Sequence, residues 1–362
     1  MKNQYCIIMA GGVGSRFWPM STTSQPKQFL DILGTGRTLI QQTFDRFIEI
    51  CPINNIYIVT NEIYKSLVLE QIPELNPENI LTEPYRKNTA PCVAYASYKI
   101  HKLNPEAITI VAPSDHLITK EDTFKKAINS CVEKAQSEDC LVTLGIKPSK
   151  PETGYGYIQF IDSPIQEQDN RMFKVKTFTE KPDYETAKFF IETGEFLWNS
   201  GIFVWKTKSI IAAFEKHDNE LAAIFKEGND YYNTSQEQEF IKKAYQICKN
   251  DSIDYSVMEK AKNVYVRSSI IGWSDLGTWG SLYSHIRHDA NNNALVGKNI
   301  LQYNCNNCIV HVPKDKLVVL QGLEDYIVAE SNGVLMVCKK EDEQQIRNFV
   351  NDVKVQKGDK FI

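Results

Sequence analysis

The first residues whose types and spacing suit chemistry form a glycine-rich loop with two cations. An apolar run of strand length, residues 6–10, leads into this group: Gly11, Gly12, Gly14, Ser15, Arg16 and Lys27. Glycine has no Cβ, so its backbone adopts left-handed conformations and its N–H groups can approach phosphate oxygens closely. The two cations would neutralise further phosphate charge. The pattern predicts an anion site, and the alternative is a tight strand-to-loop turn with incidental cations.

The loop differs from two common nucleotide-binding motifs. A P-loop requires lysine directly after its last glycine, where this chain has Ser15. A dinucleotide fingerprint that starts at Gly12 requires glycine or alanine at position 17, which is Phe17. The sequence therefore argues against both a P-loop hydrolase and a dinucleotide-dependent oxidoreductase.

Two aspartates are candidate ligands for a hard cation. Asp115 follows an apolar run in Ala-Pro-Ser-Asp-His, and Asp275 lies in Trp-Ser-Asp-Leu-Gly-Thr-Trp. Mg²⁺ prefers one or two carboxylates together with phosphate oxygens and water. Either aspartate can equally cap the helix that follows it, and position alone leaves both interpretations open.

Other polar side chains suit a hydroxylated ligand or a nucleobase. Glu180 and Lys181 are adjacent after an apolar run, so on a strand they would point to opposite faces and form no mutual ion pair. The alternative for them is a solvated charged turn before Pro182. Amides and carboxylates also hold sugar hydroxyls and the donor edge of guanine. The further candidates of this kind are Asn199, Glu83, Asn88 and Thr89.

The elements that must position these residues alternate between strand and helix over the first 145 residues. Strands are predicted at residues 5–10, 56–60, 80–82, 108–112 and 141–144. Helices are predicted at 38–50, 61–71, 88–103 and 119–136. This alternation indicates parallel strands with crossovers, and hence a doubly wound sheet whose ligands bind at the carboxyl ends of the strands. The glycine-rich loop and Asp115 would then share one sheet edge.

The pattern changes after residue 150 and again near 291. Antiparallel strands are predicted at 154–158, 173–179 and 198–205, helices at 209–225, 236–249 and 255–261, and an extended segment at 264–266. Short, evenly spaced strands follow at 299–303, 309–312, 317–320, 326–329 and 334–338, before a charged helix at 341–353. The last part is a small β domain with an oligomer surface, for which a parallel β-helix is one arrangement.

Composition is that of an ordinary globular protein. Of 362 residues, 42% are hydrophobic and 24% charged, and the net charge of −4 predicts no nucleic-acid partner. No apolar run approaches the roughly 20 residues of a membrane helix, and no signal peptide is recognisable, so we expect a cytoplasmic protein without membrane contact. The nine cysteines are expected to be reduced and mostly buried. Cys305 and Cys308 suit a turn with two thiols better than a zinc site.

Read together, the motifs resemble those of the sugar-phosphate nucleotidyltransferases, and among them the mannose-1-phosphate guanylyltransferases. The resemblance covers roughly residues 4–285 in the correct order. Its further motifs are Trp18-Pro19, Lys27-Gln28-Phe29, Glu83-Pro84-x-x-x-Asn88-Thr89-Ala90-Pro91, Pro113-Ser114-Asp115-His116, Gly154-Tyr155-Gly156-Tyr157-Ile158, Glu180-Lys181-Pro182, Trp198-Asn199-Ser200-Gly201-Ile202-Phe203 and Asp275-Leu276-Gly277-Thr278-Trp279.

The resemblance implies a role for each candidate residue. Gly11, Gly12, Gly14, Ser15, Arg16 and Lys27 would hold the triphosphate of GTP. Glu83, Asn88 and Thr89 would bind the nucleoside, and Asp115 and Asp275 would bind Mg²⁺. Gly156, Glu180 and Asn199 would hold mannose hydroxyls, with Lys181 on the sugar phosphate. Arg16, Lys27 and Lys181 would be the catalytic cations. Lys87 stands where the family often has arginine, which leaves one nucleotide contact open.

The implied reaction transfers GMP from GTP to α-D-mannose 1-phosphate, by attack of the sugar phosphate on the α-phosphorus. Alternatives are a sister specificity for another hexose or nucleotide, and a non-catalytic nucleotide-sugar sensor. The implied fold is α/β, with a Rossmann-like, mixed and mostly parallel sheet flanked by helices in residues 1–288. A small C-terminal β domain, for which a left-handed β-helix is one candidate, would occupy residues 289–362. We expect a homodimer, and no appended phosphomannose isomerase domain, because the sequence ends at Ile362.

Overall fold

The computed structural model describes residues 2–161 and 171–362, which pack as two compact units. Unit 1 is drawn from Met1–Gly11, Phe44–Ser114 and Ile118–Trp273. Unit 2 consists of Gly12–Thr43, Asp115–Leu117 and Ser274–Ile362. Most of the glycine-rich loop therefore packs with the C-terminal part of the chain, and the domain boundary expected at residue 288 stays a prediction.

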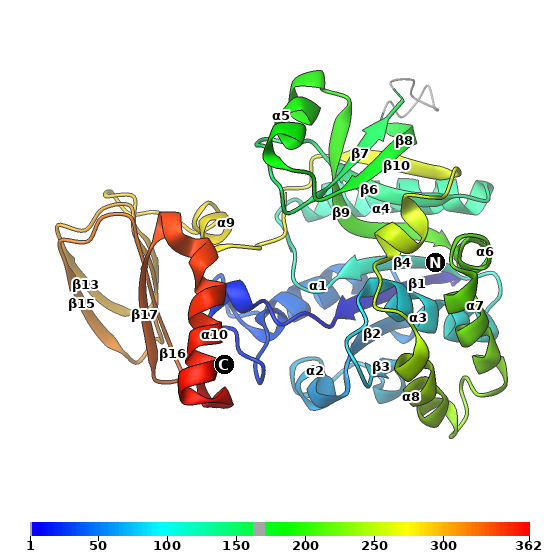
Figure 1. The fold of residues 1–362 in the computed structure, drawn as a ribbon, viewed down its shortest axis with the longest axis horizontal. Coiled ribbons are helices and arrows are strands. Elements are labelled where there is room, and N and C mark those ends of the chain that lie inside the picture. The colour runs from blue at the N-terminus through cyan, green and yellow to red at the C-terminus, as the bar shows by residue number, and fades with distance from the viewer. Residues whose placement is uncertain (1, 162–170) are drawn as a thin grey trace. The chain divides into compact units, whose positions relative to one another are not determined.

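Unit 1 is built on a nine-stranded sheet in the order β3-β2-β1-β4-β9-β6-β10-β8-β7 (Figure 1). The strands are β1 (Gln4–Ala10), β2 (Ile56–Asn61), β3 (Ile80–Glu83), β4 (Ile108–Pro113), β6 (Leu141–Ile146), β7 (Gly156–Phe160), β8 (Met172–Glu180), β9 (Phe196–Lys206) and β10 (Val264–Ser269). The sheet is mixed, as predicted, because β8 and β9 run opposite to the other strands. β1 and β4 pair in parallel, with Met9 beside Pro113, so the two motifs that follow them do leave the same sheet edge.

Helices cover both faces of this sheet. They are α1 (Leu39–Ile48), α2 (Lys65–Gln71), α3 (Thr89–Leu103), α4 (Glu121–Ser137), α5 (Tyr184–Thr193), α6 (Thr207–His217), α7 (Asn219–Lys226) and α8 (Glu237–Ile247). Tyr5 and Ile7 of β1 belong to one core with α3, α6, α7 and α8. The alternate residues Cys6 and Ile8 are also fully buried, so the opposite face is covered too. Each such side chain contributes roughly 1.5–3 kcal/mol of burial free energy.

Two local predictions differ from the structure, and one helix was not predicted. The helix expected at 209–225 is two helices, because Asp218 ends α6 and its side chain accepts a hydrogen bond from the Leu221 amide to cap α7. The helix expected at 255–261 is a single π-helical turn, Asp254–Met258. Helix α5 was not predicted, although Asp183 caps it by accepting from the Thr186 amide.

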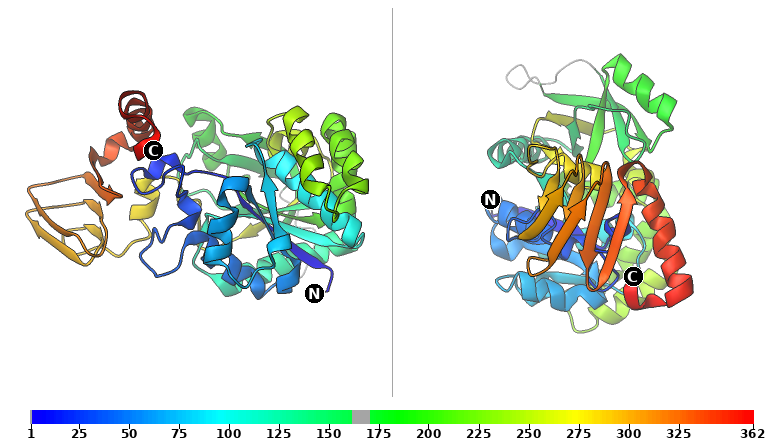
Figure 2. Two further views of the ribbon diagram at one scale, coloured as in Figure 1. Left: turned by 90° about the horizontal axis from the view of Figure 1, so that it is seen from below. Right: turned by 90° about the vertical axis from the view of Figure 1, so that its left-hand side faces the viewer.

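Unit 2 carries the C-terminal strands. A four-stranded sheet contains β12 (Ala294–Val296), β14 (Ile309–His311), β16 (Tyr326–Ser331) and β17 (Val334–Lys339), and a two-stranded sheet contains β13 (Asn299–Tyr303) and β15 (Leu317–Gln321). From β12 to β16 the chain alternates between the two sheets, and all pairs but β16–β17 are parallel (Figure 2). Val310, Val328, Ile300 and Val318 pack between them. This is the coil pattern of a parallel β-helix, and its hand stays a prediction.

A second core in unit 2 positions the glycine-rich loop. Phe17, directly after Arg16, packs against Trp279 of α9 (Trp279–Tyr283), with ring centroids 5.4 Å apart. Ile346, the first residue of α10 (Ile346–Lys357), is fully buried in the same core. The loop is therefore held by residues that lie far along the sequence.

Two other expectations concern cysteines and membranes. All nine cysteines lie in the described chain, where each is buried and outside any disulfide. Among the described residues, no helix combines the length and apolar character that a membrane crossing requires.

Candidate active site

A cavity of about 230 Å³ in unit 2 brings the loop, the lysine and the two aspartates together. We call it the cation pocket. Its lining residues are Gly14, Ser15, Arg16, Phe17, Lys27, Asp115, His116, Asp275, Leu276, Gly277 and Arg347. Five of the residues predicted for phosphate and metal binding line it beside Gly14: Ser15, Arg16, Lys27, Asp115 and Asp275.

Lys27 links the parts of the cation pocket. Its ammonium donates to Asp115 Oδ2 at 2.9 Å and to the Asp275 carbonyl at 2.7 Å, and its side chain is only 4% exposed. Its amide donates to the Val13 carbonyl at 3.1 Å, which fixes it against the loop. Gly14 has φ of 73°, and a Cβ there would collide with the Lys27 side chain. Only glycine allows the loop to pack this closely on the lysine.

Asp115 is an ionised partner of Lys27, not a helix cap. Helix α4 begins at Glu121 after Lys120 and has no side-chain cap, so the capping interpretation is wrong. Burial by itself would raise the pKa of Asp115, but the positive charges of Lys27 and His116 outweigh it and hold the pKa below its ordinary value. The carboxylate is therefore charged at neutral pH.

Asp275 also does not cap a helix. Thr278 caps α9 through a capping box with Ser281, while Asp275 Oδ1 accepts from the Gly277 amide at 3.0 Å. Two carboxylates in one pocket are the hard oxygen donors that Mg²⁺ prefers. Within the described ranges no group of three or more His, Cys, Asp or Glu could hold a metal. A Mg²⁺ ion held by Asp115 and Asp275 would therefore take its other ligands from phosphate oxygens and water. The two carboxylates fit this mode of Mg²⁺ binding.

Protein groups accept only some of the hydrogen bonds that the Arg16 guanidinium can donate. Its Nη1 donates to the Gly277 carbonyl at 3.3 Å. Its Nε is buried and has no hydrogen-bond partner among the described residues. Since a buried unpaired N–H costs roughly 1–3 kcal/mol, this donor indicates an anion that the guanidinium is built to receive.

Unit 1 gathers the residues predicted to bind a sugar. Lys181 Nζ lies 2.7 Å from Glu180 Oε1, so the expectation that they form no mutual ion pair is wrong. Strand β8 ends at Glu180, and Lys181 has φ of 48°, so the alternation of a strand does not apply to it. Gly156 pairs with Glu180 across β7 and β8, and a Cβ at 156 would collide with the Glu180 carboxylate.

Asp254 extends this group and was missed by the sequence analysis. Asn199 on β9 donates through Nδ2 to Asp254 Oδ1 at 2.9 Å, and its Oδ1 accepts from Thr143 at 3.3 Å. Burial, and then the charge of Glu180, raise the pKa of Asp254 to about 7. Asp254 begins the π-helical turn, an irregularity common at functional sites, but the residue pattern of a π turn is not readable in advance.

Glu83 lies elsewhere in unit 1, at the carboxyl end of β3. Its Oε1 accepts a hydrogen bond from Tyr245 of α8 at 2.7 Å, and a Cβ at Gly11 would lie 3.5 Å from its Oε2. Burial raises the pKa of Glu83 to about 7, although the Tyr245 hydrogen bond opposes this rise. A carboxyl group beside the first glycine of the loop stays a candidate for the nucleobase.

The side chains of the neighbouring Asn88 and Thr89 accept hydrogen bonds from backbone amides. Asn88 caps α3 by accepting from the Thr89 amide at 3.0 Å, and Thr89 Oγ1 accepts from the Ile253 amide at 2.9 Å. Lys87, the departure from the family pattern, donates to the Cys248 carbonyl at 3.0 Å. The nucleoside contacts predicted for Asn88 and Thr89 stay predictions.

The raised pKa of Glu83 makes stability depend on pH. Unfolded Glu83 ionises near 4.5 and folded Glu83 near 7, so its contribution to the free energy of unfolding falls as pH rises between these values. The difference corresponds to about 3 kcal/mol. Glutamine does not ionise, so we expect Glu83→Gln to abolish this loss. Between pH 4 and pH 8, the free energy of unfolding of the variant relative to that of the wild type should therefore rise by about 3 kcal/mol, as measured by urea unfolding.

Glu239→Gln, on the same helix as Tyr245 but exposed and paired with Lys243, is the matched control. We expect it to follow the wild-type pH profile closely, because an exposed ion pair contributes little to stability. Parallel profiles for Glu83→Gln and the wild type would show that Glu83 does not titrate in this range.

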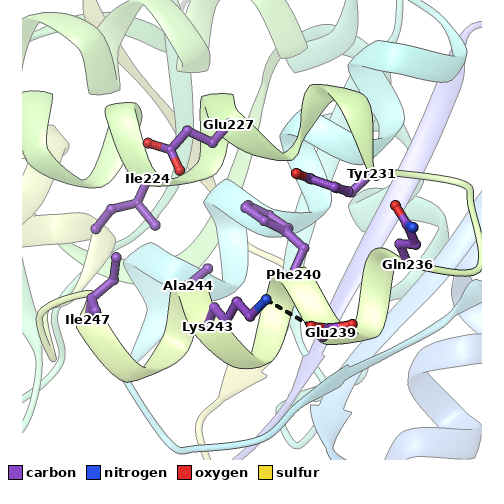
Figure 3. A pocket seen from close by; sticks show the side chains of 9 residues that line it. All are labelled: Ile224, Glu227, Tyr231, Gln236, Glu239, Phe240, Lys243, Ala244 and Ile247. Atoms are coloured by element: carbon purple, nitrogen blue, oxygen red, sulfur yellow. Dashed lines mark hydrogen bonds and ion pairs between the residues drawn. The ribbon is translucent and has the colours of Figure 1, made fainter.

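Two further features lie apart from these groups. Cys305 Sγ and Cys308 Sγ donate to the carbonyls of Tyr303 and Asn306, at 3.5 and 3.2 Å. A cavity of about 380 Å³ between α7 and α8 is mostly apolar, with the Glu239–Lys243 ion pair beside it (Figure 3). None of the predicted site residues lines this cavity.

Comparison with known proteins identifies the family to which the chain belongs. Residues 5–292 match the Nucleotidyl transferase family, to which the chain therefore belongs. The chain is 33% identical to a mannose-1-phosphate guanylyltransferase of Escherichia coli, over 95% of this chain and 74% of the relative. It is 34% identical to the alginate biosynthesis protein AlgA of Pseudomonas aeruginosa, over 97% of this chain and 72% of that relative. The family resemblance inferred from the motifs is confirmed.

A solved structure extends the agreement to the tertiary level. The crystal structure described as mannose-1-phosphate geranyltransferase from Thermus thermophilus superposes with a TM-score of 0.85 at 28% identity. The alignment covers 97% of this chain and 99% of that one, so the C-terminal strands belong to the shared fold.

Proposed function

We propose that the protein transfers GMP from GTP to α-D-mannose 1-phosphate, giving GDP-mannose and pyrophosphate. The observation that carries the proposal is the cation pocket, where Lys27 joins Asp115 to Asp275 beside the incompletely paired Arg16. Membership of the nucleotidyl transferase family, and similarity to guanylyltransferases over nearly the full chain, support the same reaction.

The reaction joins two anions, so charge repulsion is its main barrier. An oxygen of the sugar phosphate attacks the α-phosphorus of GTP, and the bond from that phosphorus to the oxygen bridging the β-phosphate breaks as pyrophosphate leaves. A phosphate oxygen is already deprotonated at neutral pH, so no general base is needed. Positioning and charge neutralisation are what the protein supplies.

We assign Arg16 and Lys27 of the cation pocket to the triphosphate, together with the backbone of Gly11, Gly12, Gly14 and Ser15, of which Gly14 and Ser15 line the pocket. Asp115 and Asp275 would hold Mg²⁺, which when bound neutralises phosphate charge and orients the phosphate chain. Because Lys27 already pairs with Asp115, the carboxylate stays ionised and ready to bind the metal.

Residues of unit 1 are assigned to the sugar and the base. Glu180 and Asn199 would accept and donate hydrogen bonds to mannose hydroxyls, with Gly156 leaving room beside the carboxylate. Asp254, fixed by Asn199, is a further candidate for a hydroxyl. Lys181 would contact the sugar phosphate, and Glu83, Asn88 and Thr89 the nucleoside. A homodimer remains our expectation for the assembly.

The direct test is a panel that crosses GTP, ATP, UTP and dTTP with mannose 1-phosphate and other hexose 1-phosphates in the presence of Mg²⁺. We expect pyrophosphate release and formation of GDP-mannose from GTP and mannose 1-phosphate. Preferred turnover of glucose 1-phosphate with UTP or dTTP would assign a sister specificity, since one hydroxyl configuration changes only one or two hydrogen bonds. Nucleotide-sugar binding without any turnover would identify a sensor.

A further inference from the structure

Arg347 of α10 also lines the cation pocket, although it lies beyond residues 5–292 that match the family. Three contacts of neighbouring residues fix the position of α10. Ile346, the preceding residue, is fully buried in the core that contains Phe17. Glu343, one turn earlier, accepts from the Gly280 amide at 2.8 Å. Trp18 of the loop donates through Nε1 to the Phe361 carbonyl at 2.7 Å, beyond the other end of α10.

The same anchors place two guanidinium groups close to each other. Phe17 follows Arg16 and Ile346 precedes Arg347, and their burial in one core directs the two arginines to the same pocket. The elements that carry them pack together, as the blue loop and the red helix show (Figures 1 and 2). The positive charge of Arg16, followed by partial burial, lowers the pKa of Arg347.

In the described structure the two carboxylates of the cation pocket are engaged elsewhere: Asp115 pairs with Lys27, and Asp275 accepts from the Gly277 amide. In residues 2–161 and 171–362 the Arg347 guanidinium makes no hydrogen bond or ion pair, and Glu343 on the preceding turn is engaged with Gly280. Arg16 Nε is likewise buried without a partner in the described structure. An anion between two like charges with open donors relieves their repulsion, and a multiply charged phosphate chain fits a pair of guanidinium forks.

We propose that Arg347 is a second arginine for the β- and γ-phosphates of the nucleoside triphosphate and for the pyrophosphate that leaves. The inference rests on the proposed function for the identity of the reaction, but the phosphate contact itself does not depend on which sugar is used. It makes the C-terminal helix a part of the active site, since Arg347 reaches the pocket only while α10 is anchored on the loop.

The test compares Arg347→Ala and Arg347→Lys with Lys357→Ala, which removes an exposed charge from the same helix. Titration calorimetry measures binding of inorganic pyrophosphate with Mg²⁺, and steady-state assays measure KM for GTP and for mannose 1-phosphate. We expect Arg347→Ala to weaken pyrophosphate binding and raise the KM for GTP by roughly 10-fold to 100-fold, the scale of a charged hydrogen bond. The KM for mannose 1-phosphate should change little.

The other variants separate a phosphate contact from a role in folding. Arg347→Lys keeps the charge without the fork, so we expect an intermediate affinity. Lys357→Ala should bind pyrophosphate like the wild type. Because Arg347 is exposed, melting temperatures should be unchanged, and Arg347→Gln is a second neutral variant if Arg347→Ala folds poorly.

Two outcomes would refute different claims. If Arg347→Ala turns over at the wild-type rate and binds pyrophosphate as tightly as the wild type, the role of Arg347 is refuted and the proposed function is left intact. Absence of wild-type turnover with every sugar phosphate would refute the proposed function. Loss of pyrophosphate binding in Arg347→Ala would, even then, support the phosphate contact.

Discussion

Lys27→Met is expected to lower turnover by roughly 10²–10³, the scale of one preorganised electrostatic contact. The substitution removes the ammonium that joins Asp115 Oδ2 to the Asp275 carbonyl but retains most of the buried volume of the side chain. It leaves the Asp115 carboxylate without its counter-charge in a partly buried position, so a loss of stability accompanies the loss of rate. Steady-state kinetics at saturating GTP and a thermal melt measure the two effects.

Lys134→Met is the matched control for this experiment. Lys134 is equally buried, at 3% exposed, and also pairs with a carboxylate, that of Glu138, but in unit 1 and outside the predicted groups. We expect it to lower the melting temperature without changing turnover of the folded enzyme. Equal losses of turnover in Lys27→Met and Lys134→Met would show that Lys27 acts only through stability.

Asp115→Asn is expected to raise the Mg²⁺ concentration for half-maximal activity by roughly 10-fold to 100-fold. Asparagine keeps an oxygen that can accept from Lys27, so the pocket retains its packing while it loses the negative charge that a hard cation requires. Because Lys27 and His116 hold the pKa of Asp115 below its ordinary value, wild-type Mg²⁺ dependence should change only in acid, where this carboxylate is protonated. Activity assays over a Mg²⁺ series at fixed pH measure the shift.

Asp289→Asn supplies the comparison in the same unit. Asp289 accepts hydrogen bonds from the Asn291 and Asn293 amides in a turn and does not line the cation pocket. Its replacement should lower stability but leave the Mg²⁺ requirement unchanged. A normal Mg²⁺ requirement in Asp115→Asn would refute the metal-binding role and leave Asp115 as the partner of Lys27.

Local sequence patterns predicted most of the sheet, because burial on both faces selects unbroken apolar runs. β1, β2, β3, β4 and β6 all begin within one residue of the predicted positions. The order of the strands was beyond these patterns. β9 inserts antiparallel between β4 and β6, and its partners lie far from it in the sequence, so no local signal specifies the neighbours.

The errors have equally local causes. Lys181 pairs with Glu180 because a positive φ just past the strand end reverses the expected direction of its side chain. The capping interpretations of Asp115 and Asp275 failed because each helix starts farther along the chain than its motif suggests. Asp254 was missed because it begins a π turn, whose position depends on packing more than on residue type.

The sequence by itself determined the chemistry of this protein: a glycine loop with two cations and separate aspartates, in an order that resembles one family. These features are readable because they depend on residue type and short spacing. The tertiary structure alone decided that Lys27 joins Asp115 to Asp275, that Arg16 keeps an unpaired donor, and that Arg347 enters the same pocket. The physical reason is that such contacts form when buried side chains such as Phe17, Trp279 and Ile346 pack in one core, across separations that no local pattern records.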